Sequence, residues 1–166
     1  MAHKTMTVHG SGKVRNLEAG AKAQVTLEER MKTAMYAETF LQCFEPAIDN
    51  LARNGAKLAV NAGASDTQLL AEVVARMVSD RGHADKLRVA WVEGDDVTQQ
   101  VNGLIAKGER FESLMHGKRL EEWGLEPICA QAYLGGLGIA EALRQGADIV
   151  ICGRVADAAP VIGVAA

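Results

Sequence analysis

Polar and charged side chains follow three apolar, strand-like segments of this chain, and these residue types can bind or transform a ligand. A carboxylate can act as a general acid or base, and an arginine can pair with a phosphate or carboxylate group. Because the carboxyl ends of parallel strands lie at one edge of a sheet, we expect these side chains to gather around a small anionic ligand. They are Asn61 and Asp66 after the first segment, Glu93, Asp95 and Asp96 after the second, and Arg154 and Asp157 after the third.

A glycine-rich turn near the end of the chain adds a second kind of anion-binding group. Gly135 and Gly136 precede a short helical pattern, and Ile149–Cys152 is a β-branched run that ends at Gly153 and Arg154. The free N–H groups at the start of a helix favour an anion. This part of the chain therefore predicts a site as well as a fold.

The same residues also have structural interpretations. Asp66, Asp96 and Asp157 stand where helix N-caps stand, and Arg154 can pair with Asp95 or Asp157. The glycines can serve tight turns and close packing. Oxygen ligands from Asp95, Asp96 and Asp157 for a hard cation are a further alternative, although we expect no metal site.

Apolar periodicity alternates between helix and strand from Thr33 onward. A helix is expected over 33–54, kinked at Pro46 and ended by Gly55, and a second helix begins at the Ser65–Gln68 capping box. A third helix places Val101, Leu104 and Ile105 inward. The expected strands are Thr5–Val8, Lys57–Val60, Leu87–Val92, Pro127–Ala130 and Ile149–Cys152, and further helices follow Gly136 and Val155.

This alternation predicts an α/β fold, a three-layer sandwich with a mostly parallel, Rossmann-like sheet. The 166 residues suit a single domain, with residues 1–32 poorly ordered or loosely packed. Hydrophobic residues make up 48% of the chain and aromatic residues 4%, so the core must be aliphatic, as in a sheet covered on both faces.

Charge and composition narrow the functional classes. The net charge is −3, whereas a nucleic-acid-binding protein needs a basic surface, so this class is not expected. No apolar run approaches the ~20 residues of a membrane span, and no signal peptide is recognised at the N-terminus. We interpret Cys43, Cys129 and Cys152 as reduced, buried thiols of a cytoplasmic protein.

Four motifs stand out along the chain: Asn61–Asp66, Val89–Val97, Pro127–Gly136 and Ala147–Ala158. In this order they resemble the acyclic terpene utilisation A (AtuA-like) family, and its fungal members in particular. The resemblance covers residue 37 to the end. It implies an α/β N-terminal domain and a link to the catabolism of citronellol and geraniol through acyl-CoA thioesters, beside a biotin-dependent carboxylase.

The matching motif positions become the candidate site. We expect catalytic roles for Glu93, Asp95, Arg154 and Asp157, and ligand binding by Asn61, Gly63, Asp96, Tyr133, Gly135, Gly136 and Gly153. Family members begin with a further strand and a glycine-rich loop and continue beyond Ala166. The chain is therefore expected to be an incomplete domain whose open sheet edge favours a homo-oligomer.

Three functions stay open at this point. The first is a protein of acyclic terpene catabolism that binds an acyl-CoA-type anion; as an enzyme it would be lyase- or hydratase-like or carboxylase-associated, with an unknown cofactor. The second is an NADP-dependent oxidoreductase, suggested by a strand, glycine-rich turn, helix and strand ending on Arg154, although Glu141 replaces the last small residue of the fingerprint. The third is a non-catalytic subunit or inactive oligomeric fragment.

Overall fold

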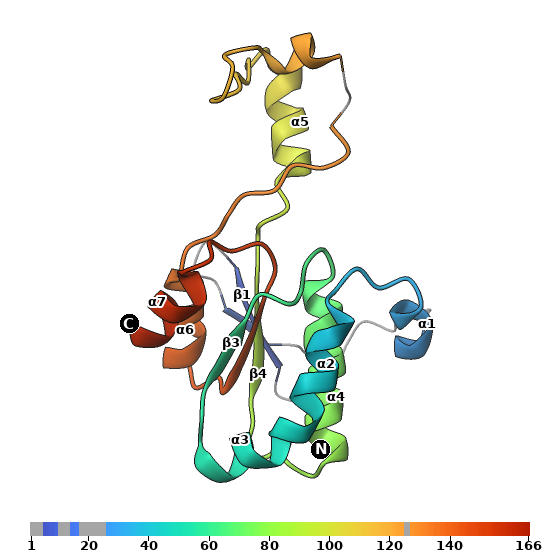
Figure 1. Cartoon of the computed structure of the whole chain (residues 1–166), viewed down its shortest axis with the longest axis vertical. Helices are drawn as coiled ribbons and strands as arrows, with labels where there is room; N and C mark the ends of the chain where they lie inside the picture. The colour runs from blue at the N-terminus through green and yellow to red at the C-terminus, as the bar shows by residue number, and fades with distance from the viewer. Residues whose placement is uncertain (1–4, 10–13, 17–25, 125–126) are drawn as a thin grey trace. The chain divides into compact units, whose positions relative to one another are not determined.

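A computed structural model describes residues 5–9, 14–16, 26–124 and 127–166. The chain divides into two compact units (Figure 1). The first contains the residues up to Asp95 together with Tyr133–Ala166, and the second is Asp96–Ala132. The expected single domain over residues 1–166 stays a prediction. Most of the segment expected to be loosely packed, namely residues 1–4, 10–13 and 17–25, lies outside the described residues.

The first unit is built on a five-stranded sheet with the order β2-β1-β4-β5-β3. Neighbouring strands are parallel except for β2, which pairs antiparallel with β1. The mostly parallel sheet of an α/β fold is therefore confirmed. The strands are β1 (Thr5–His9), β2 (Val14–Asn16), β3 (Leu58–Val60), β4 (Val89–Glu93) and β5 (Ile149–Cys152).

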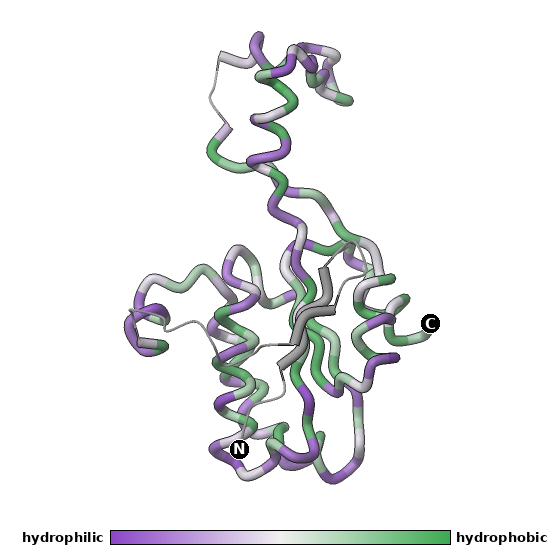
Figure 2. Tube along the Cα trace, turned by 180° about the vertical axis from the view of Figure 1, so that it is seen from behind, coloured by the Kyte–Doolittle hydropathy of each residue, from purple (hydrophilic) through white to green (hydrophobic). Residues whose placement is uncertain are grey.

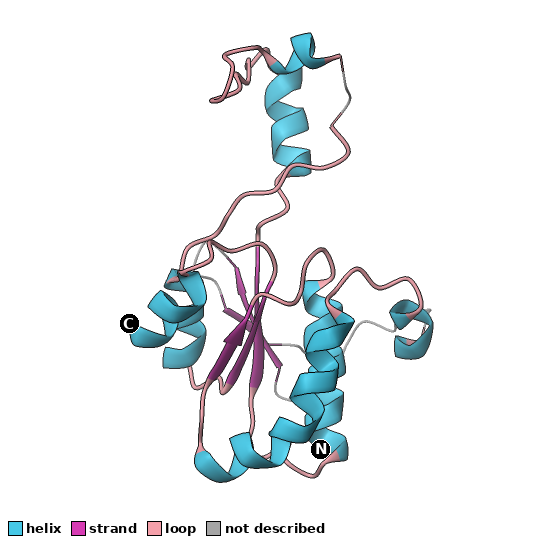
Figure 3. Ribbon diagram, in the orientation of Figure 1, coloured by secondary structure: helices cyan, strands magenta, loops and turns pink. Residues whose placement is uncertain are grey.

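Helices cover both faces of this sheet (Figure 3). Trp91 and Ile151 pack toward one face, whereas Val92 and Cys152 pack toward the other, as expected for side chains that alternate along a strand. All four residues of β5 are buried, which explains their apolar, β-branched composition. The first face is covered by α2 (Glu38–Phe44), α3 (Ile48–Asn54) and α4 (Thr67–Asp80), and the second by α6 (Leu137–Arg144) and α7 (Ala159–Ala165).

The expected kink at Pro46 is confirmed. A short 3-10 turn, η1 (Glu45–Ala47), separates α2 from α3, because proline lacks the N–H that a continuous helix would need. Gly55 ends α3 with a φ of 62°, a left-handed conformation that favours glycine. Further upstream, α1 (Leu27–Met31) begins with a Thr26–Glu29 capping box that the sequence analysis did not identify.

The start of α4 differs from the expectation. The helix begins at Thr67, and the Ser65–Gln68 capping box does not form. Asp66 occupies the N-cap position, but its carboxylate accepts a hydrogen bond from the backbone N–H of Met35 at 2.5 Å instead. The loop after β3 is thereby tied to the segment that precedes α2. The residues that α4 buries include Leu69, Leu70, Val73, Val74 and Val78, which recur at helical spacing.

The second unit contains α5 (Thr98–Ala106) and a 3-10 turn, η2 (Leu120–Trp123). The prediction of a strand at Pro127–Ala130 is wrong. The carbonyl oxygen of Ala130 accepts from the N–H of Val97, and its own N–H donates to Oγ1 of Thr98, so this segment does not join a sheet. The inward placement of Leu104 and Ile105 is also wrong, since both are exposed.

The three cysteines do not share one environment. Cys152 is buried, as expected, but Cys43 and Cys129 are exposed, so burial was predicted wrongly for two of them. The exposed Cys129 belongs to the segment that failed to form a strand. In the described part of the chain, no helix is both long and apolar enough to cross a bilayer.

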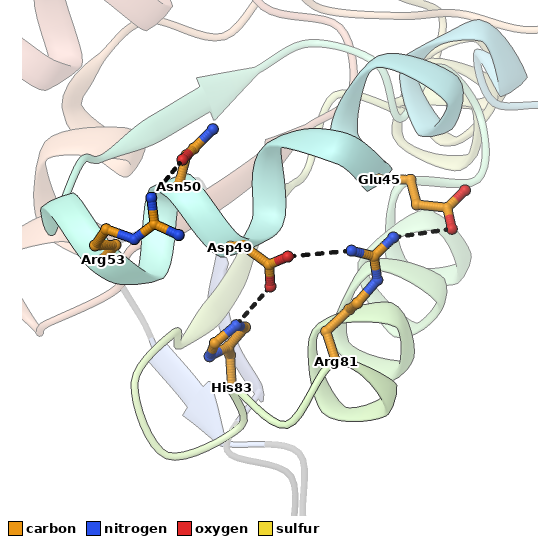
Figure 4. A network of polar contacts seen from close by, with 6 residues as sticks. All are labelled: Glu45, Asp49, Asn50, Arg53, Arg81 and His83. Carbon is orange, nitrogen blue, oxygen red and sulfur yellow. Dashed lines mark hydrogen bonds and ion pairs between the residues drawn. The ribbon is translucent and has the colours of Figure 1, made fainter.

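A polar network joins α3 to the turn after α4 (Figure 4). The Oδ1 atom of Asp49 lies 2.8 Å from Nε2 of His83, and its Oδ2 atom accepts from Arg81 at 3.3 Å. Arg81 also binds Glu45 at 3.2 Å. The hydrogen bond with His83, supported by the charge of Arg81, holds the pKa of Asp49 below its ordinary value.

Asp49→Asn should therefore destabilise the protein in a pH-dependent way. A carboxyl whose folded-state pKa is lowered contributes stability above its unfolded pKa of about 3.9, and this contribution is lost as the pH falls through the folded value. The difference in melting temperature between wild type and variant should be present near neutral pH and shrink under acid. Asp85→Asn, at an exposed carboxylate of the same turn, is the control; an equal pH-dependent loss there would contradict the assignment.

Candidate functional site

The topology of the first unit selects one point of the sheet as a place for a ligand. β3 is followed by α4 on one face, whereas the neighbouring β5 is followed by α7 on the other face. In open α/β sheets, ligands bind outside the carboxyl ends of strands where the connections diverge in this way. The parallel register sets Val60 beside Ile151, so the two strands end close together.

Close packing joins the ends of these strands. The N–H of Gly63 donates to the carbonyl oxygen of Cys152 at 2.9 Å. A Cβ atom on Gly63 would lie 2.6 Å from Oγ1 of Thr67 and 2.7 Å from that same carbonyl oxygen. The position therefore requires glycine, because the loop after β3 runs directly against the end of β5.

The end of β4 is held to the same place by a buried carboxylate. Asp95 is 7% exposed, and its Oδ2 atom accepts a hydrogen bond from the backbone N–H of Arg154 at 2.7 Å. A Cβ atom on Gly153 would lie 2.6 Å from that oxygen and 2.7 Å from Oγ1 of Thr67. We call this close-packed group the strand-end junction; it consists of Gly63, Thr67, Asp95 and Gly153.

The strand-end junction changes the role expected for Asp95. A carboxylate that is buried and bonded to main chain acts on the conformation of its neighbours. Thr67 was not a candidate in the sequence analysis, although its hydroxyl contacts two of the glycines that were. Thr67 and Gly153 are far apart in the sequence and meet only in the folded protein. The sequence around Thr67 therefore gave no sign of this contact.

Arg154 and Tyr133 form the exposed part of the arrangement. The guanidinium carbon of Arg154 lies 5.6 Å from the centre of the Tyr133 ring, within cation–π range. The N–H of Leu134 donates to the carbonyl oxygen of Arg154 at 3.2 Å, which fixes the two residues against each other. An exposed guanidinium on a fixed main chain suits a phosphate or carboxylate group.

The start of α6 follows directly on this pair. Gly136 is the N-cap residue, and a Cβ atom there would lie 2.9 Å from the carbonyl oxygen of Ala159 and from the nitrogen of Gly163. Gly136 thus permits close contact between α6 and α7. Gly135 is exposed, and a Cβ atom there would meet nothing within 4 Å. Its role as a ligand-binding position stays a prediction.

The remaining candidates are dispersed. Glu93 accepts a hydrogen bond from Nε1 of Trp91 at 3.0 Å on the α4 side of the sheet. Asn61 and Asp157 are exposed near the ends of β3 and β5. Ala158, and not Asp157, is the N-cap of α7, so the capping alternative for Asp157 is wrong.

Asp96 lies in the second unit. Its carboxylate accepts from the backbone N–H of Thr98 at 2.9 Å, at the first residue of α5. Hydrogen bonds from Thr98, first from its side chain and then from its backbone, hold the pKa of Asp96 below its ordinary value. The structural interpretation of Asp96, as a residue that satisfies the start of a helix, agrees with this geometry.

Two alternatives from the sequence lose support. Among the described residues, no group of three or more His, Cys, Asp or Glu side chains is placed to hold a metal ion, so Asp95, Asp96 and Asp157 do not form the alternative cation site. The dinucleotide fingerprint needs a strand before its glycine-rich turn. Here the segment before Gly135 forms no such strand, and Glu141 of α6 binds Gln145 and Arg144.

Comparison with known proteins gives one match. The family model described as acyclic terpene utilisation family protein AtuA matches residues 1–166, which is the whole chain. No curated protein matches the chain. No solved structure matches it either. The family match extends the resemblance in the four motifs to the residues before position 37.

Gly153→Ala should destabilise the first unit, because its Cβ would overlap the carboxylate of Asp95 and the hydroxyl of Thr67. Overpacking of this kind costs about 1–3 kcal/mol, measurable by urea unfolding. Gly135→Ala is the control, because a Cβ atom there meets nothing within 4 Å, and it should change the free energy of unfolding by less than about 0.5 kcal/mol. Equal effects of the two substitutions would contradict the close-packed junction.

The cysteines should differ in reactivity. Burial, followed by the charge of the nearby Asp95, raises the pKa of Cys152 to about 12, so its thiolate is scarce at neutral pH. Iodoacetamide, followed by peptide mass spectrometry, should label Cys43 and Cys129 in the folded protein and Cys152 only after unfolding. Rapid labelling of Cys152 in the folded protein would contradict its burial.

Proposed function

Because this chain belongs to the acyclic terpene utilisation family, we propose that it acts in the breakdown of acyclic terpenes such as citronellol and geraniol through acyl-CoA intermediates. Its ligand is a small anion of the acyl-CoA type, bound at the carboxyl ends of the strands in the first unit. The protein works in the cytoplasm, where such thioesters are consumed. The proposal includes the reaction class: as an enzyme, the protein would act like a lyase or hydratase, or together with a carboxylase.

One observation carries this assignment: the guanidinium of Arg154 is exposed beside Tyr133 while its main chain is locked to Asp95 and Leu134. Because the main chain of Arg154 is already fixed, ligand binding would have to order only its side chain, and the contact with the Tyr133 ring already restricts that side chain. Arg154 would pair with a phosphate or carboxylate, and the N–H groups at the start of α6 would add to the positive potential.

The roles of the carboxylates divide according to burial. Asp95 would position Arg154, since its carboxylate is buried and bonded to the backbone of that residue. Asp157 is an exposed carboxylate three residues after Arg154, and Glu93 is half-buried at the end of β4. These two are therefore the candidates for a general acid or base. Asn61, Gly63 and Gly153 would shape the site from the ends of β3 and β5.

Arg154→Ala should weaken ligand binding and leave the fold intact. A hydrogen bond to a charged group contributes about 1.5–3 kcal/mol, so affinity should fall by about 10- to 150-fold. The measurement is the thermal shift of each protein with coenzyme A and with geranoyl-CoA, because ligand bound to the folded state raises its stability. Arg144→Ala is the control, since Arg144 is also exposed, is the last residue of α6 and pairs with Glu141 of the same helix.

Two results would argue against the proposal. Equal shifts for wild type and Arg154→Ala would remove Arg154 from the site, even if the ligand binds elsewhere. No shift of the wild-type protein with either compound, despite a cooperative melt in buffer, would remove the acyl-CoA class of ligand. A loss of cooperative melting in Arg154→Ala alone would show a structural role, and Arg154→Lys would then test the charge.

A further inference from the structure

Residues 35–37, which we call the strap, are bonded to residues 61–66, which we call the β3 loop. The N–H of Ala37 donates to the carbonyl oxygen of Ala62 at 2.9 Å. Tyr36 anchors the strap, since it is 9% exposed and belongs to the hydrophobic core on one face of the sheet. The hydrophobic residues that the strands contribute to that core can be followed in Figure 2. The strap is therefore a fixed support for the β3 loop.

Met35 of the strap bonds to the β3 loop in both directions. Its carbonyl oxygen accepts from the N–H of Ser65 at 3.2 Å, and its N–H donates to the carboxylate of Asp66 at 2.5 Å. A hydrogen bond to a carboxylate is stronger than one between neutral groups. The N–H of Asp66 also donates to the carbonyl oxygen of Gly63 at 2.9 Å, within the loop. Asp66 therefore closes the β3 loop and fastens it to the strap.

The β3 loop contains a strained residue. Ala64 has a φ of 45°, in the left-handed region that a residue with a Cβ atom adopts rarely. Such a conformation persists where the surroundings over-determine it, and it is frequent in segments that hold ligands. The strap constrains the loop on one side, and the bond from Gly63 to the carbonyl oxygen of Cys152 constrains it on the other. The loop is thus held in one conformation in the free protein.

Asn61 is the exposed side chain at the start of this loop. Val60, before it, is paired in the sheet, and Ala62, after it, is buried and bonded to the strap. The amide of an asparagine can donate two hydrogen bonds, which suits an oxygen of an anionic ligand. Asn61 therefore resembles Arg154 in one respect: a polar side chain leaves a main chain that is already fixed.

We propose that Asp66 is a positioning residue of the anion site, which acts by holding the β3 loop, and with it Asn61, in the conformation that binds the ligand. This assignment rests on the proposed function, in which Asn61 and Arg154 serve an acyl-CoA-type anion at the ends of β3 and β5. Asp66 acts through its bond to Met35 and without contact to the ligand. A loop that is ordered before binding adds little ordering cost to it.

Hydrogen exchange of the ligand-free protein, read by mass spectrometry, tests the hold on the loop. Asp66→Ala removes the acceptor for the N–H of Met35, so amides of the β3 loop should exchange about 10-fold faster as local opening becomes easier. Asp66→Asn keeps an acceptor oxygen and should restore slow exchange. Unchanged exchange in Asp66→Ala would overturn the proposal.

Isothermal titration calorimetry with coenzyme A and with geranoyl-CoA tests the effect on the site. Asp66→Ala should raise the dissociation constant by about 10-fold, if the loop is then competent in about a tenth of the molecules. Because Asp66 acts through Asn61, the double variant D66A/N61A should bind no more weakly than Asn61→Ala alone. Additive losses in the double variant would contradict this route.

Asp148→Ala is the matched control for stability. The carboxylate of Asp148 accepts from the backbone N–H of Arg88 at 2.8 Å, at the amino end of β5 and away from the proposed site. This variant should melt at a lower temperature and keep wild-type affinity. If the wild type binds neither compound, the proposed function and the role of Asp66 both fall. If the wild type binds and Asp66→Ala binds equally well, only the role of Asp66 falls.

Discussion

The buried carboxylate of Asp95, packed against the main chain of Gly153 and Arg154, is the constraint on which the structure at the carboxyl ends of the strands depends. A buried carboxylate costs free energy unless hydrogen-bond donors compensate it, and the N–H of Arg154 supplies one at 2.7 Å. That bond requires Gly153 to approach within van der Waals distance of the carboxylate, so a side chain there is excluded. The main chain of Arg154 is thus fixed inside the protein while its guanidinium extends outside.

The same burial separates structural from reactive groups at the ends of the strands. Cys152 lies one residue before Gly153, and its thiol is kept protonated by burial and by the nearby carboxylate. It therefore contributes volume to the core beneath α6 and no nucleophile. Arg154, Tyr133 and Asp157 are exposed, so in the proposed site they are the groups that a ligand can reach. A close-packed interior that holds exposed polar groups suits such a site.

The sequence predicted the parts of the structure in which local pattern and tertiary environment agree. The apolar sequence Ile149–Cys152 predicts a buried strand, and the strand is buried because helices cover both of its faces. The apolar residues between Leu69 and Val78 recur at helical spacing because one face of α4 is buried. Pro127–Ala130 has the same apolar character, but a strand also needs a partner, which the sequence does not show. Asp95 and Asp96 are adjacent and chemically identical, and only a contact 59 residues away distinguishes the buried one from the exposed one.

The main chain of Arg154 also bonds to residues on both sides of the second unit, Asp96–Ala132, which is inserted in the sequence of the first unit. Its N–H meets Asp95, the last residue before the segment, and its carbonyl oxygen meets Leu134, just after it. The entropic cost of closing a loop rises by only about 0.6 kcal/mol for each doubling of its length, so changes in the length of this segment should cost the first unit little. The bonds of Arg154 to Asp95 and Leu134 would hold the two ends together whatever the length between them.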